Sequence, residues 1–209
     1  MNLSLGDTRL IIDACKAKGV LRNQCAYVLA TAYHETAHTM RPITEMGGMN
    51  YLKSKPYYPF IGRGYVQLTW EANYKKASAK LGVDFVKNPG LLLQAKYAAP
   101  ILVVGMVEGW FTGKSLSSYI TLSKSDFVGA RRIINGTDKA SLIAGYAQQY
   151  NDLLLTEGYG VAGRPAPKIA PEIQKTTPEI PKATPAPAIG GFWAALFNII
   201  AKIFGRKSP

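Results

Sequence analysis

The chain has 209 residues, of which 47% are hydrophobic and 18% are charged, and its formal net charge is +12 at pH 7. That balance excludes an intrinsically disordered chain and leaves room for one large core with appendages. Residues 1–161 carry 18 Lys/Arg against 11 Asp/Glu, and residues 162–209 carry 7 against 2. The excess of cations favours an anionic partner such as nucleic acid, anionic lipid or an anionic cell wall. No arginine-rich run or zinc-finger spacing indicates nucleic acid, so we expect none.

Apolar periodicity predicts helices along most of the chain. We expect them at residues 4–18, 22–38, 71–81, 91–112, 125–134 and 138–155. The 91–112 segment is almost wholly apolar and is predicted to be the central buried helix, with Pro100 in its first turn or at a break. No strand pattern of any length competes, so the fold is predicted to be mainly α.

The N-terminus and the cysteines indicate where the chain is made. Residues 1–9 lack the basic start and apolar stretch of a secretory signal peptide, so we expect synthesis in a cytosol. Cys15 and Cys25 are the only cysteines, and both have apolar neighbours on predicted helices. We predict two reduced, buried thiols rather than a disulfide.

One carboxylate lies at the end of the second predicted helix. Val28, Ala32 and Glu35 are spaced i, i+4 and i+7, so Glu35 is predicted to project from a core-facing side of the helix. Because burial disfavours the charged form, such a carboxyl should keep its proton to higher pH, as a general acid requires. The alternative is a helix-end glutamate turned to water.

The same segment also fits a metal-binding pattern. His34-Glu35-x-x-His38 matches the two-histidine zinc pattern of metalloproteases, with Glu35 as the base. The chain has no further histidine, so a third ligand would have to be an acid such as Glu45 or Glu71. The alternatives that this pattern leaves open are a zinc peptidase or a non-catalytic wall-binding protein that uses these side chains.

A long irregular stretch follows, and it is rich in Gly, Pro and Tyr between residues 39 and 61. Loops of this length inside a compact domain are usually functional. Tyr51, Tyr57 and Tyr58 either offer flat surfaces to sugar rings or pin the loop. Glycines flank Arg63 in the next segment, and Gln67 and Thr69 share one side if residues 65–70 are extended.

Three patterns in order carry a resemblance to a known family. His34-Glu35-Thr36, then Gly62-Arg-Gly-Tyr-Val-Gln-Leu-Thr69 with Asn73-Tyr74, then Ile133-Ile-Asn-Gly136 resemble the family 19 glycoside hydrolases. These are chitinase-like enzymes, and the chain is most similar to their phage endolysin branch over about residues 5–158. The resemblance implies a lysozyme-like helical domain with a cleft that hydrolyses β-1,4-linked N-acetylated sugars with inversion. It implies no metal and no cofactor.

The resemblance also assigns roles to single residues. It implies that Glu35 is the general acid, that Glu45 is a loop-borne, solvated general base, and that Thr69 helps to hold the attacking water. Glu45 takes its role as the only carboxylate between Glu35 and Glu71. One departure is that Ala37-His38 follows the first pattern, where the family often has glycine. The residues predicted to contact substrate are Tyr58, Arg63, Tyr65, Gln67 and Asn135.

The last quarter of the chain differs in composition from the rest. Residues 1–161 are predicted to form the catalytic domain, residues 162–191 a Pro/Ala/Lys-rich linker, and residues 192–209 an amphipathic helix. The apolar run of this helix would be about 20 Å long, too short to span a bilayer, so we expect it to lie in a membrane interface. The alternative is a helix that docks on the domain itself. The predicted membrane-active residues are Phe192, Trp193, Leu196, Phe197, Ile200, Lys202 and Ile203.

Together these patterns predict a monomeric peptidoglycan-degrading enzyme whose tail contacts an anionic bacterial membrane. We expect it to stay in the host cytoplasm until it is released and then to act in the periplasm on the cell wall.

Overall fold

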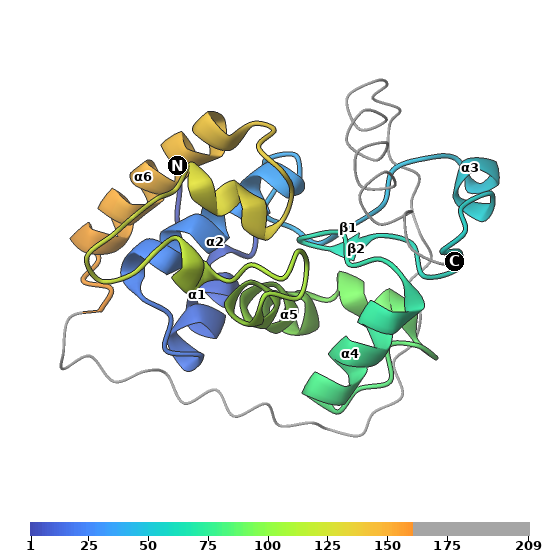
Figure 1. Cartoon of the computed structure of the whole chain (residues 1–209). Helices are drawn as coiled ribbons and strands as arrows, with labels where there is room; N and C mark the ends of the chain where they lie inside the picture. Colours follow the sequence, from blue (N-terminus) through green and yellow to red (C-terminus); the bar gives the residue numbers. More distant parts are fainter. Residues whose placement is uncertain (161–209) are drawn as a thin grey trace. The chain divides into compact units, whose positions relative to one another are not determined.

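The structure, a computed structural model, describes residues 1–160. The predicted linker and C-terminal helix lie outside the described residues. Helices dominate the described part, as predicted (Figure 1). The α-helices are α1 (Thr8–Ala17), α2 (Arg22–Glu35), α3 (Met49–Lys53), α4 (Glu71–Leu81), α5 (Ala95–Glu108) and α6 (Ala140–Thr156).

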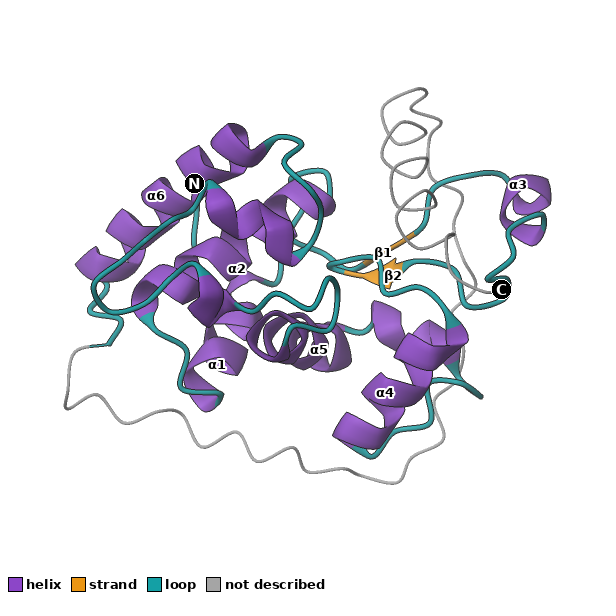
Figure 2. Ribbon diagram, in the orientation of Figure 1, coloured by secondary structure: helices purple, strands orange, loops and turns teal. Residues whose placement is uncertain are grey.

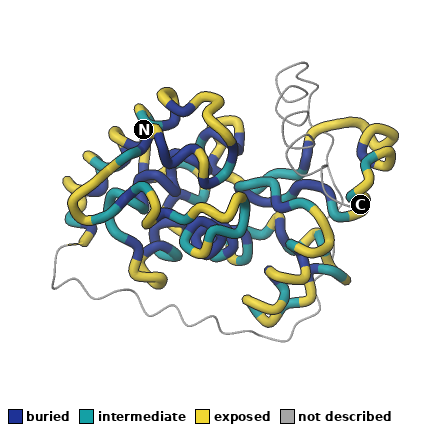
Figure 3. Tube along the Cα trace, viewed as in Figure 1, coloured by how far each residue is buried: buried dark blue, intermediate teal, exposed yellow. Residues whose placement is uncertain are grey.

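Helix α2 is the centre of the main core. Eight consecutive residues, Cys25 to Ala32, are buried, so this helix is covered on every side (Figures 2 and 3). Several of them are alanines, which let α1 and α6 approach closely. Helix α5 is also buried over most of residues 98–106, so the core has two buried helices where the sequence predicted one.

Helix α2 ends at Glu35, three residues earlier than predicted. The Thr36 hydroxyl donates to the Ala32 carbonyl (2.7 Å) and accepts from the Met40 N–H (3.0 Å), which closes the helix. The backbone then turns left-handed, with φ of 49° at Ala37 and 68° at His38. Glycine adopts these angles without strain, whereas Ala37 and His38 adopt them at a cost.

A second, smaller core forms around α4. Its buried members are Leu68, Tyr74, Ala77, Phe85, Leu92 and Ile101. Helix α5 contributes to both cores and contains Pro100 in its interior. The predicted 91–112 helix is therefore divided into a 3₁₀ turn, η1 (Pro89–Leu93), and α5, while the predicted 125–134 helix is reduced to the 3₁₀ turn η3 (Gly129–Ile133).

Between the two cores lies a two-stranded antiparallel sheet that the sequence did not predict. Strand β1 (Ile43–Thr44) pairs with β2 (Arg63–Gly64), with Ile43 opposite Gly64 and Thr44 opposite Arg63. Strands of two residues are too short to show an alternating pattern. The pairing fixes both ends of the long 39–61 loop, and with them the position of Glu45.

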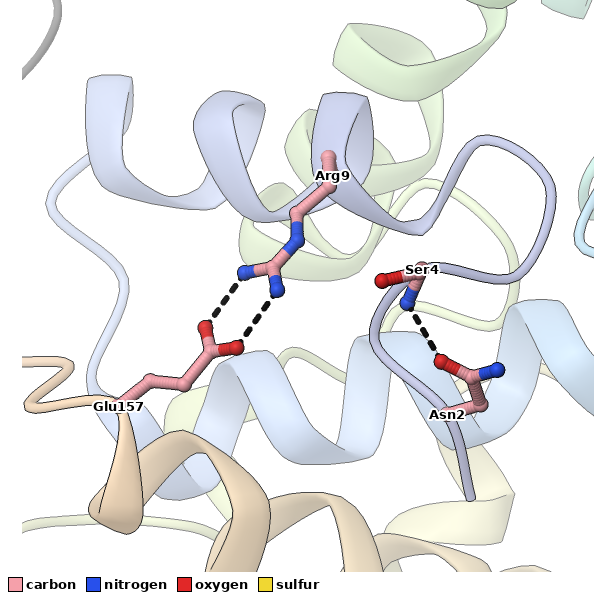
Figure 4. Close-up of polar contacts among 4 residues, drawn as sticks. All are labelled: Asn2, Ser4, Arg9 and Glu157. Atoms are coloured by element: carbon pink, nitrogen blue, oxygen red, sulfur yellow. Dashed lines mark hydrogen bonds and ion pairs between the residues drawn. The ribbon is translucent and has the colours of Figure 1, made fainter.

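The N-terminal segment is held to the end of α6 by an ion pair. The two terminal nitrogens of the Arg9 guanidinium donate to the Glu157 carboxylate, at 2.5 and 2.6 Å, and the Asn2 side chain accepts from the Ser4 N–H nearby (Figure 4). The two charged side chains are 52% and 38% exposed, so the pair contributes at most about 1 kcal/mol to stability.

The two cysteines lie in the main core. Cys15 and Cys25 are buried and are not joined by a disulfide. Burial raises the pKa of the Cys15 thiol well above its usual range, which keeps it protonated. None of the helices within residues 1–160 has the length and apolar character that crossing a membrane requires.

Candidate active site

Glu35 is held by a buried ion pair. It is 5% exposed, and the buried side chain of Arg131, in the turn η3, donates from Nη1 to its Oε1 at 2.7 Å. Arg131 Nε donates to the Asp138 carbonyl (2.9 Å), so the guanidinium is fixed at two points. The predicted apolar setting of Glu35 was therefore incomplete, because a cation compensates the charge of the enclosed carboxylate.

The second oxygen of Glu35 is uncommitted. Within residues 1–160, Glu35 Oε2 makes no hydrogen bond, and it is not among the fully enclosed polar atoms. A carboxyl oxygen without a donor aimed at it can carry a proton and donate it outward. Glu35 is thus arranged to be anchored through one oxygen and to react through the other.

Polar side chains continue inward from Glu35 along α2. Tyr27, Thr31 and Glu35 are spaced i, i+4 and i+8, so they share one face of the helix. Burial is the main cause that raises the pKa of Tyr27, and the nearby charge of Arg131 opposes it. This face of α2 therefore carries buried polar side chains up to Glu35.

Glu45 is held by neutral donors. It follows β1 directly, and its Oε1 accepts from the Tyr57 hydroxyl (2.7 Å) while its Oε2 accepts from the Gly62 N–H (3.0 Å). Burial, followed by the hydrogen bond to Glu45, raises the pKa of Tyr57, so this hydroxyl stays a donor. Glu45 is only 3% exposed, and the prediction of a solvated side chain was wrong because the 39–61 loop folds back over it.

A tight turn places the Gln67 side chain beside Gly62, which also packs against Glu45. The chain reverses between Arg63 and Leu68, and Gln67 has a left-handed φ of 54°, so residues 65–70 do not form an extended segment. Gln67 Nε2 donates to the Ile43 carbonyl (3.2 Å), which ties the turn to β1. Thr69 Oγ1 donates to the Gln67 carbonyl (2.7 Å), which leaves its lone pairs free to accept a hydrogen from water.

Two residues predicted to contact substrate have structural contacts. Tyr65 is 1% exposed, and its hydroxyl donates to Asp7 Oδ2 (2.9 Å), so its ring belongs to the main core, and its contact with substrate stays a prediction. The Arg63 guanidinium donates to the Tyr74 hydroxyl (2.6 Å) and to two loop carbonyls, which directs it into the 59–63 loop.

Of the remaining three residues predicted to contact substrate, Gln67 lies in the turn described above, and Asn135 and Tyr58 lie in different settings. Asn135 is 4% exposed, one turn beyond Arg131, and its N–H donates to the Arg131 carbonyl (2.9 Å). Tyr58 is 42% exposed, next to the residue that donates to Glu45. Both positions remain compatible with substrate contact, which stays a prediction.

The contacts therefore form two groups. One contains Glu35, Arg131 and the 135–138 loop, and the other contains Glu45, Tyr57 and the 62–69 turn. Only residues 36–42 separate the end of α2 from the start of β1, so the two carboxylates lie on adjoining elements.

The two-histidine zinc pattern does not have its required geometry. Because α2 ends at Glu35, His34 and His38 are not on one helix face. His38 is exposed and stacks on the Tyr33 ring, with the centroids 4.4 Å apart. Among the side chains of residues 1–160, no group of three or more His, Cys, Asp or Glu is placed to hold a metal ion.

Two partners of the carboxylates were missed from the sequence. Arg131 could have been suspected because two adjacent arginines interrupt the apolar run from Val128 to Ile134, and at least one had to face inward. Tyr57 gave no comparable signal, since it is one of three tyrosines in the same loop.

Gly62 is the point of closest packing at Glu45, and we predict that Gly62→Ala destabilises the domain. An added Cβ would lie 2.8 Å from Gln67 Oε1 and 3.4 Å from Glu45 Cβ. Either neighbour must move, so we expect a loss of about 1–3 kcal/mol in the free energy of unfolding, measured in urea. Gly145→Ala is the matched control: it lies in α6 with open space around it and should stabilise the protein by about 0.5–1 kcal/mol. Wild-type stability in Gly62→Ala would contradict this packing.

His34 should make stability depend on pH. Burial is the main cause that lowers the pKa of His34, so the folded state prefers neutral imidazole. The unfolded chain binds the proton more readily, near the ordinary pKa of about 6.5. This stabilisation is therefore complete above that pKa and is lost as the pH falls towards the lower pKa of the folded state.

We expect the free energy of unfolding to fall between about pH 7.5 and about pH 5.5, and to fall less in His34→Gln. His38→Gln is the control, because His38 is exposed and its removal leaves the buried imidazole in place. Urea titrations at several pH values measure the slopes, and equal slopes for wild type and His34→Gln would overturn the assignment.

Known proteins resemble this chain in sequence and in fold, although no family model matches it. It is 35% identical to an endochitinase of Arabidopsis thaliana over 85 residues, and 29% identical to the acidic endochitinase of Dioscorea japonica over 146 residues. These matches cover 36% and 62% of this chain. The chain spans only 32% and 56% of the length of these two relatives.

Among solved structures, the chain is similar to chitinase C from Streptomyces griseus HUT6037. The TM-score is 0.56 at 22% sequence identity, and the match covers 70% of this chain and 68% of that one. A glutamate-to-glutamine variant of chitinase C matches with a TM-score of 0.50. The domain of residues 1–160 therefore has a mainly α, chitinase-like fold, which confirms the fold class predicted from its sequence.

Proposed function

We propose that the chain is a glycosidase that cleaves β-1,4 bonds between N-acetylated sugars by an inverting, two-glutamate mechanism. The observation that carries the proposal is the pair of buried carboxylates on adjoining elements, each compensated in a different way. Similarity to endochitinases supports the reaction class. No metal or cofactor takes part in the proposed mechanism.

Glu35 serves as the general acid. Arg131 anchors Oε1, and the uncommitted Oε2 carries the proton that is transferred to the leaving-group oxygen. Such a transfer needs a carboxyl that holds one oxygen still and turns the other towards the substrate. The Glu35–Arg131 pair has that arrangement.

Glu45 serves as the general base. Donors face both of its oxygens and hold the carboxylate in a fixed orientation. Each oxygen keeps a lone pair that can accept a proton from water. The Thr69 hydroxyl, already committed as a donor to Gln67, helps to hold that water as an acceptor.

We further propose that the substrate is bacterial peptidoglycan and that the enzyme is a muramidase-type phage endolysin that lyses the host. The support is the sequence resemblance together with the net charge of +12, which favours an anionic wall over a neutral polymer. On this proposal the enzyme is held in the host cytoplasm until release and acts in the periplasm as a monomer. Residues 192–209, which the structure does not describe, act on an anionic membrane.

Replacing either catalytic carboxyl should abolish hydrolysis while the variant stays folded, although Glu35→Gln leaves the buried charge of Arg131 without its partner and should be less stable than wild type. Glutamine keeps the size of Glu35 and an acceptor for Arg131 but cannot supply the proton, so Glu35→Gln should lower reducing-end release from purified peptidoglycan at least about 100-fold. Glu45→Gln should be almost as damaging. The control is Glu71→Gln, because Glu71 is half-exposed and pairs only with Lys75 on the same helix. Appreciable activity in Glu35→Gln would sink the assignment.

The tail is tested in the full-length protein by Phe197→Lys. A charge on the apolar face of an interfacial helix opposes membrane insertion but leaves the wall-cutting site unchanged. We expect normal hydrolysis of purified peptidoglycan and much weaker killing of intact Gram-negative cells. Equal killing by the variant and wild type would rule out a membrane-active tail.

A further inference from the structure

The surface beside Glu45 carries cations without acidic partners. Between Glu45 and Glu71 the chain has Lys53, Lys55 and Arg63 and no acidic residue. The Arg63 guanidinium is committed to Tyr74 and to loop carbonyls. Neither Lys53 nor Lys55 forms an ion pair with a carboxylate in residues 1–160.

Lys55 is held in a defined place close to the site. Its Nζ lies 3.7 Å from the centroid of the Tyr51 ring, a short cation–π contact. The Tyr51 ring packs on Gly47, where an added Cβ would lie 2.5 Å from Tyr51 Cδ1. Gly47 is two residues beyond Glu45, so the lysine is fixed on a ring that lies on the backbone of the site.

The other end of the same loop returns to the same carboxylate. Tyr57, two residues after Lys55, donates to Glu45, and its ring contacts Trp70 edge-to-face at 5.2 Å. Lys55 therefore lies between Tyr51 and Tyr57 in the sequence, where the Tyr51 ring packs on Gly47 and the Tyr57 hydroxyl donates to Glu45. It is placed to meet a group that projects from a chain bound there.

The surroundings of Lys55 are amphipathic. Within residues 1–160, five of the eleven exposed large hydrophobic side chains lie between residues 46 and 70. A surface that combines exposed aromatic rings with unpaired cations suits a glycan that carries anionic substituents better than a neutral glycan. These five side chains are Met46, Met49, Tyr51, Tyr58 and Trp70.

We infer that Lys55, oriented by Tyr51, binds a carboxylate on the peptide stems of the peptidoglycan substrate, with Lys53 adding charge. This inference rests on the proposed function and names the feature of the wall that the site recognises. Lys55 acts on binding and not on the chemical step, since within residues 1–160 its ammonium group forms no ion pair with Glu35 or Glu45. The site would then prefer anionic wall over chitin-like chains through this one contact.

The experiment measures the activity of wild type and of each variant on two substrates. One substrate is native peptidoglycan, and the other is the same material with its carboxyl groups converted to neutral methylamides. Initial rates of reducing-end release are measured at limiting substrate. Wild type should cut the native wall about three- to tenfold faster than the neutralised wall, as expected for one partly exposed charge pair.

The variants separate charge recognition from support of the loop. Lys55→Gln should lower the rate on native wall by that same factor and leave the rate on neutralised wall unchanged. Lys55→Arg should retain the preference, because it keeps both the charge and the ring contact. The matched control is Lys76→Gln, since Lys76 also lies over an aromatic ring, 4.9 Å from the Trp110 centroid, but on α4.

Two results would overturn the inference. Equal losses on both substrates in Lys55→Gln would show that the lysine only supports Tyr51, and an unchanged preference would show that it meets no carboxylate. If wild type cuts neither wall, the proposed glycosidase function fails instead, so the two failures are distinguishable.

Discussion

The domain depends on a buried ion pair at the end of a buried helix. Glu35 and Arg131 are 96 residues apart in sequence, and their contact ties the η3 turn to α2. Leaving either charge without its partner in such a setting costs about 3–5 kcal/mol, so the two segments must be correctly placed together. The pair therefore fixes the geometry of the site and links the C-terminal part of the domain to its core.

The charge of the second buried carboxylate, Glu45, is compensated in a different way from that of Glu35. Glu45 is equally enclosed, but a neutral hydroxyl and a backbone N–H compensate its charge. Both of its oxygens face donors, whereas Glu35 leaves one oxygen free. Two enclosed carboxylates with different partners can take different proton-transfer roles in one site, which is how a fold separates an acid from a base.

Features that follow from helical periodicity could be predicted from the sequence. Features that depend on a single contact between distant residues could not. Helix α4 was predicted with its bounds, and Glu35 was placed on the core side of α2, because both follow from helical periodicity. The burial of Glu45 and the core position of Tyr65 were missed, since they arise where a loop folds back and where a hydroxyl finds Asp7. Neither composition nor local periodicity reveals such contacts between residues that are far apart in the sequence.

The early end of α2 shows how a local departure from a motif can be accommodated. Ala37 and His38 occupy left-handed backbone, which non-glycine residues adopt at a cost of about 1–2 kcal/mol each. His38 recovers part of that cost by stacking on Tyr33 and by meeting Tyr146 edge-to-face at 5.9 Å. The strained turn therefore packs against α6 through the aromatic rings of Tyr33, His38 and Tyr146. These contacts stabilise the end of α2 although neither position 37 nor position 38 is glycine. His38, which completes the two-histidine pattern in the sequence, therefore stabilises this turn through its ring contacts.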